Sequence, residues 1–238
     1  VTELSDEQMR QVLAGPLREA AVLAVQLGID VEQVGRMLKV LEETGQLENT
    51  IVIFEITLSN LKAAGEIDEQ DFMDRAELLC SLGHTVMISN FQEYYKLVEY
   101  LNNYTKERMG LTMGVNNLID VFDEKYYRHL SGGILEAFGK LFFKNLRVYL
   151  YPMRDAESGR ILTSNNIKVH PRMKELYKFF KYNGKVMDII DYDPDVLHIY
   201  SRDVLKKKTH DDDGWEEMLP EGRSEIIRKK HLFFQKQD

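Results

Sequence analysis

The sequence predicts an α/β protein with a mostly parallel sheet of about four or five strands and flanking helices. Short apolar runs begin near positions 51, 85, 109 and 146, and helix-like segments separate them. This alternation is expected of βαβ units. The first run is almost continuously apolar, as in a strand that is buried on both faces. A Rossmann-like sheet and one half of a longer (β/α) barrel both fit this pattern.

Composition restricts the partners and the compartment. The net charge of -8 argues against nucleic acid and anionic membranes as general partners. No apolar run approaches the roughly 18 residues of a membrane span. The single cysteine, Cys80, excludes an internal disulfide framework and fits a reducing, cytoplasmic compartment. The chain begins with Val1, as expected of a piece of a longer protein.

Three regions are predicted along the chain. Residues 1–50 form a helical N-terminal segment, because Ser5 and Gln8 match a capping box and glycines at 15, 28 and 45 end successive helices. This segment is either a cap on the sheet or an oligomerisation element. Residues 51–205 form the α/β core. Residues 206–238 form an extension that packs on the core or on a partner.

The elements of the core follow in order from their boundary residues. Asp68 caps the first core helix and Gly83 ends it, Asn90 with Glu93 caps the second, and Pro152 stops the fourth strand. The predicted strands are 51–57, 85–89, 109–115 and 146–151, with 186–190 as a fifth candidate. The predicted helices are 69–82, 91–104, 118–122, 134–143, 171–183, 193–205 and 221–230.

Polar residues gather where the predicted parallel strands end, which is where such sheets bind ligands. Glu55 interrupts an apolar strand, and a carboxylate placed there is costly without a purpose. We therefore predict Glu55 as a general acid or base. Helix starts and an arginine could bind an anion. The predicted ligand-binding residues are Ser89, Asn90, Asn116, Asn117, Gly132, Gly133, Arg154 and Asp155.

The stretch 78–90, Leu-Leu-Cys-Ser-Leu-Gly-His-Thr-Val-Met-Ile-Ser-Asn, resembles a segment of the haloacid-dehalogenase-like phosphatases. In that family a helix and a strand lead to a Ser/Thr-Asn pair whose hydroxyl binds phosphate, which would fall on Ser89. The family's first strand ends in Asp-x-Asp, whereas this chain has Phe54-Glu55-Ile56-Thr57. The resemblance, within residues 51–95, therefore implies a poor phosphatase or a binding relative.

Two functions follow from the sequence. In the first, the strand ends bind a small anionic metabolite, phosphorylated or carboxylated, and Glu55 makes the protein an enzyme. In the second, the chain is a non-catalytic interaction or regulatory module. The His210-Asp-Asp-Asp turn matches no zinc or EF-hand spacing, so we assign no metal ligand. The sequence specifies no cofactor, and it leaves a homo-oligomer or a partner chain open.

Overall fold

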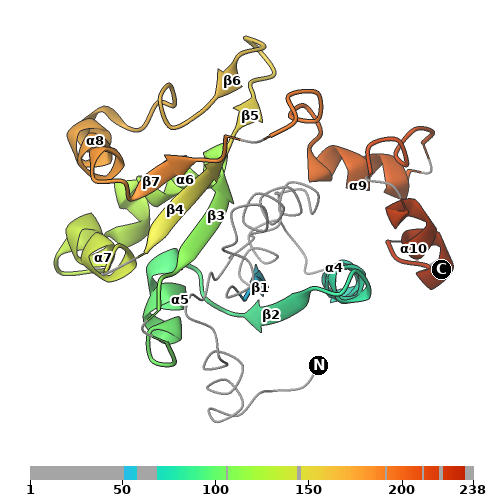
Figure 1. The fold of residues 1–238 in the computed structure, drawn as a ribbon, viewed down its shortest axis with the longest axis horizontal. Coiled ribbons are helices and arrows are strands. Elements are labelled where there is room, and N and C mark those ends of the chain that lie inside the picture. The colour runs from blue at the N-terminus through green and yellow to red at the C-terminus, as the bar shows by residue number, and fades with distance from the viewer. Residues whose placement is uncertain are drawn as a thin grey trace.

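The protein is described here from a computed structural model. The described elements alternate between strands and helices, which confirms a mixed α/β architecture (Figure 1). The predicted helical segment at 1–50 lies outside the described residues. The described ranges are 51–57, 69–105, 107–143, 146–190, 192–210, 212–219 and 222–233.

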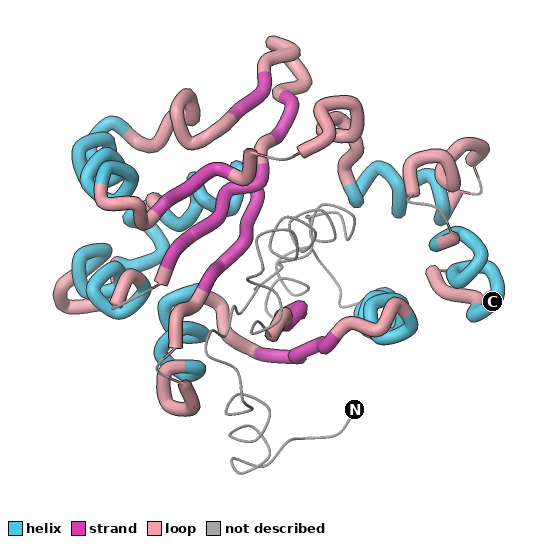
Figure 2. The backbone as a smooth tube through the Cα atoms, viewed as in Figure 1, coloured by secondary structure: helices cyan, strands magenta, loops and turns pink. Residues whose placement is uncertain are grey.

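Five strands lie within the five predicted runs, but they do not form one sheet. A parallel pair consists of β1 (Ile53–Thr57) and β2 (Thr85–Ser89). A separate parallel sheet has the order β3-β4-β7, from Gly110–Gly114, Arg147–Tyr151 and Val186–Asp188. In Figure 2 the two groups of strands lie apart. The prediction of a sheet of four or five strands is therefore wrong for the described residues. Apolar periodicity identifies a strand but does not select its neighbour.

Seven described α-helices connect these strands or follow them. None of them is long and apolar enough to cross a membrane. A short antiparallel hairpin, β5 (Met153–Arg154) with β6 (Ile161–Leu162), leaves the end of β4. The α-helices are α4 (Glu69–Ser81), α5 (Tyr94–Leu101), α6 (Val115–Val121), α7 (Gly133–Leu141), α8 (Lys174–Tyr182), α9 (Ser201–Thr209) and α10 (Arg223–Lys230), and two short 3-10 helices are η2 (Glu124–Tyr127) and η3 (Pro171–Met173).

Several described helices start at other residues than predicted, among them α5, α6 and α9. The helix α5 begins three residues later than predicted, and Glu93 rather than Asn90 is its N-cap residue. The helix α6 begins directly after β3 with Gly114 as its N-cap residue. The helix α9 begins at Ser201. At its predicted start, the carboxylate of Asp193 accepts a hydrogen bond from the backbone N–H of Asp195 in a local turn.

The main core contains a cluster of aromatic rings that joins α6, α7 and α8. Phe122, fully buried at the end of α6, packs edge-to-face on Phe138 at 4.9 Å and on Tyr177 at 5.1 Å between ring centroids. Phe142 stacks on Phe180 at 4.2 Å. Edge-to-face and offset arrangements are the favourable ones for aromatic pairs. These contacts hold the three helices to each other.

Gly110 gives β3 room for a neighbouring ring. A Cβ atom at this position would lie 2.9 Å from Cε2 of Tyr149 on β4. We expect Gly110→Ala to lower the free energy of unfolding by about 1–2 kcal/mol, because overpacking a strand interior forces a shift of the ring. Urea unfolding measures this. Gly114→Ala is the matched control, since nothing lies within 4 Å of its Cβ position. Equal stability of the two variants would contradict the close contact.

The C-terminal residues contact α4. Trp215, Ile227 and Leu232 form a small second core, against which Leu78 of α4 packs. The backbone N–H of Phe233 donates a hydrogen bond to the buried carboxylate of Asp74. Lys230 and Glu77 form an ion pair between α10 and α4. In Figure 1 α10 accordingly lies beside α4, on the side away from the three-stranded sheet.

Candidate functional site

Glu55 and Ser89 meet on one face of the β1–β2 pair. The parallel register places Glu55 opposite Met87 and Thr57 opposite Ser89. Because side chains alternate along a strand, Glu55, Thr57 and Ser89 share a face near the C-terminal ends. The hydroxyl of Ser89 donates a hydrogen bond to Oε1 of Glu55. Both side chains were predicted from sequence as site residues, and the structure brings them into contact.

The pKa of the Glu55 carboxyl is shifted toward neutral pH. Only 2% of the residue is exposed to solvent. Burial penalises the charged form and outweighs the hydrogen bond from Ser89, which favours it. The pKa of Glu55 is therefore raised from 4.5 to about 7. A carboxyl with such a pKa is present in both protonation states near neutral pH, as proton transfer requires.

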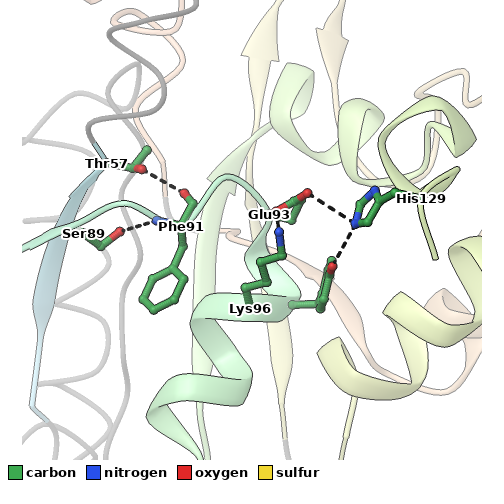
Figure 3. A network of polar contacts seen from close by, with 7 residues as sticks. Thr57, Ser89, Phe91, Glu93, Lys96 and His129 are labelled. Carbon is green, nitrogen blue, oxygen red and sulfur yellow. Dashed lines mark hydrogen bonds and ion pairs between the residues drawn. The ribbon is translucent and has the colours of Figure 1, made fainter.

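The loop between β2 and α5 is held by side chains from both strands (Figure 3). The hydroxyl of Thr57 donates to the carbonyl of Phe91 at 2.8 Å. The N–H of Phe91 donates to the hydroxyl oxygen of Ser89 at 3.2 Å. These bonds keep the backbone of Phe91 outside the helix, which explains the late start of α5. They also fix the first turn of α5 relative to Glu55.

Polar contacts also secure the first turn of α5 on its other side. The carboxylate of Glu93 pairs with Lys96 at 2.7 Å and approaches Nε2 of His129 at 3.8 Å. The same ring nitrogen lies 3.2 Å from the hydroxyl of Tyr95. Figure 3 shows Glu93 between Lys96 and His129. Glu93 makes no side-chain cap to α5, so its carboxylate leaves the first N–H groups of the helix to other acceptors.

Tyr94 is the residue at this site that sequence reasoning missed. Its hydroxyl is fully enclosed and has no hydrogen-bond partner among the described residues. Leaving a buried hydroxyl unpaired costs about 1–3 kcal/mol. From the sequence, Tyr94 is one of several aromatic residues on an amphipathic helix, which indicates core packing. Only the absence of a hydrogen-bond partner distinguishes it, and no sequence pattern records that.

None of the three predicted asparagines is a helix N-cap residue. Asn90 is exposed after β2 and, against prediction, is not the N-cap residue of α5. Asn116 and Asn117 do not cap α6, because they lie within its first turn. The side-chain amide of Asn116 is exposed and donates to the sulfur of Met153 at 3.8 Å. Asn117 is half-buried.

The remaining predicted ligand-binding residues contact their own chain. The N–H of Gly132 donates to the carboxylate of Glu136 at 3.0 Å, and that of Gly133 donates to the carbonyl of Leu130. Arg154 donates to the carbonyls of Gly159 and Pro194 and so joins the β5–β6 hairpin to a later loop. The carboxylate of Asp155 accepts from two N–H groups and a hydroxyl within the same hairpin.

Within the described part of the chain, no three His, Cys, Asp or Glu side chains gather closely enough to hold a metal ion. No protein-family model matches the sequence. A comparison with curated proteins also finds no match. The candidate functional site therefore consists of the residues at the ends of β1 and β2.

Proposed function

We propose that the C-terminal ends of β1 and β2 bind a small anionic ligand, phosphorylated or carboxylated, and that Glu55 transfers a proton to or from it. The observation that carries this proposal is the buried Glu55 carboxyl with a pKa of about 7, held by Ser89. Proton-transferring groups are commonly tuned in this way by burial. If position 55 had only a structural role, an apolar side chain would suit this apolar strand better than a glutamate.

An anion is the favoured ligand because of α5. The N-terminus of a helix carries a partial positive charge and directs N–H groups outward. The side chain of the N-cap residue Glu93 does not cap α5, and the first turn of α5 is fixed next to the Glu55–Ser89 pair by the contacts of Phe91. The resemblance to haloacid-dehalogenase-like phosphatases also implies a phosphate at Ser89, so phosphorylated ligands belong among the candidates.

Ligand binding can be tested by thermal and urea unfolding with inorganic phosphate, sugar phosphates, nucleotides, dicarboxylic acids and 2-oxo acids. We expect one class to stabilise the protein by about 2.7 kcal/mol at one hundred times its Kd. Ser89→Ala should weaken that effect, since it removes a group that positions Glu55. Ser158→Ala, the same change in the exposed β5–β6 hairpin, is the control and should leave it unchanged. Stabilisation that survives Ser89→Ala unaltered would place the ligand elsewhere.

A second candidate function, a non-catalytic interaction module, is favoured by exposed apolar side chains. Tyr182 and Ile190 are 83% and 86% exposed, and large exposed apolar groups are typical of contact surfaces when they cluster. No stabilisation by any of the ligand classes would favour this candidate over the first. The large exposed apolar residues of the α7, α8 and β7 region are Leu135, Phe143, Phe179, Tyr182, Met187 and Ile190.

A further inference from the structure

Tyr94 differs from the two other tyrosines that pack within the core near α6. The hydroxyl of Tyr127 donates to the carbonyl of Val121 at 2.9 Å. The hydroxyl of Tyr177 donates to the carbonyl of Ser164 at 2.7 Å. The hydroxyl of Tyr94 is equally enclosed but has no such acceptor among the residues that the structure describes. A buried polar group without a partner calls for an explanation, and a bound ligand is one of the few available.

The surroundings of Tyr94 identify the kind of group that it could bind. The carboxyl of Glu55 on β1 is close enough to act electrostatically on it, as are Tyr127 and Asp120 of α6. Burial, followed by these groups, holds the pKa of Tyr94 well above its usual range. The phenol therefore stays protonated near neutral pH, so its O–H is available to donate to an acceptor such as an oxygen that gains negative charge.

We propose that Tyr94 donates a hydrogen bond to a carbonyl oxygen of the substrate, and that Glu55 removes a proton from the carbon next to that carbonyl. This inference rests on the function proposed above and narrows its substrate class to carboxylates or phosphate esters that carry a ketone or 2-oxo group. The anionic part would lie at the start of α5, and the carbonyl between Glu55 and Tyr94. A base together with a donor for the developing oxyanion is the arrangement that this chemistry needs.

The step balances without a further reagent. The C–H electron pair becomes the new C=C bond, and the carbonyl π pair moves to the oxygen, where the O–H of Tyr94 stabilises it. Glu55 becomes a carboxylic acid. Its proton exchanges with solvent and returns to the same carbon, or to a neighbouring one in an isomerisation. In heavy water the substrate therefore gains deuterium next to its carbonyl.

Proton NMR in heavy water measures this exchange directly on pyruvate, 2-oxoglutarate and dihydroxyacetone phosphate. We expect the protein to accelerate exchange on at least one probe, with a rate that rises with pH and levels off above about 7. Tyr94→Phe should lower the maximal rate by at least about 100-fold, the usual loss for an oxyanion donor. Tyr177→Phe is the matched control and should retain the rate.

Stability separates a role of Tyr94 in binding from a structural role. We expect Tyr94→Phe to leave Tm unchanged or to raise it, since the change removes an unpaired hydroxyl, whereas Tyr177→Phe should lower Tm because it breaks a buried hydrogen bond. A Tyr94→Phe variant that exchanges as fast as the wild type, or that loses Tm like Tyr177→Phe, would overturn the inference. Binding of an anion without exchange would overturn it while leaving the proposed function intact. If the protein neither binds an anion nor accelerates the exchange, the inference and the proposed function are both contradicted.

Discussion

Glu55→Gln should stabilise the folded protein at pH 8 and leave its stability nearly unchanged near pH 4. The pKa of Glu55 is about 7 in the folded state and 4.5 in the ordinary state that the unfolded chain approximates. The unfolded chain therefore releases this proton at a lower pH than the folded protein does. Between pH 4.5 and 7 the folded state loses stability as pH rises, and above 7 the loss is complete.

The size of this effect follows from the difference between the two pKa values, which corresponds to about 3 kcal/mol above pH 7. Glutamine has a similar shape, cannot ionise, and keeps an oxygen that accepts from Ser89. Urea unfolding of both proteins at intervals from pH 4 to 8 measures the difference. Glu175→Gln on the exposed face of α8 is the control and should show no comparable pH dependence. Parallel stability curves for wild type and Glu55→Gln would mean that Glu55 ionises normally in the folded protein.

The same variant tests whether the site is maintained at the expense of stability. If Glu55 transfers protons, Glu55→Gln should lose ligand-dependent proton exchange while it gains stability at pH 8. Functional residues often destabilise the fold that carries them, and replacing them then stabilises it. A variant that is both more stable and still fully active would separate Glu55 from the chemistry.

Phe122→Ala should lower the free energy of unfolding by about 3–5 kcal/mol. Phe122 is fully buried, and its ring contacts Phe138, Tyr177 and Phe180 from two helices. Removing it leaves a cavity among rigid rings, which collapse poorly around missing volume. Urea unfolding monitored by far-UV circular dichroism measures the loss of stability.

The matched control for this cavity is Phe179→Ala. Phe179 is 59% exposed, and its ring packs edge-to-face with that of Phe180 at 5.3 Å between centroids. We expect Phe179→Ala to cost less than about 1 kcal/mol, because little buried apolar area is lost. If the two alanine variants were equally stable, the aromatic cluster would not be what fixes α6, α7 and α8 to each other.

Much of the secondary structure could be predicted from the sequence because it depends on local patterns. The apolar run at 85–89 is β2 residue for residue, and β1, β3, β4 and β7 lie within their predicted runs. Gly83 follows α4 and adopts a left-handed conformation with a φ of 83°. A glycine placed directly after an amphipathic helix predicts this conformation. These features need only nearby residues.

The arrangement of strands depended on tertiary structure. The five strands divide into a pair and a sheet of three, because pairing is chosen by contacts between distant segments. The start of α5 likewise depends on Thr57, 34 residues before Phe91 in the chain. A capping pattern such as Asn90 with Glu93 is a local signal, and these long-range hydrogen bonds override it.

The candidate site shows the same division. A carboxylate in an apolar strand identifies Glu55 from sequence alone, since burying a charge is costly wherever the strand lies. Tyr94 could not be identified in this way, because the sequence does not show whether the hydroxyl of a core tyrosine has a hydrogen-bond partner. The sequence by itself thus determined the strands, most helices and the unusual carboxylate. Which groups surround that carboxylate was decided only by the tertiary structure, since hydrogen-bond partners come from segments that no local pattern connects.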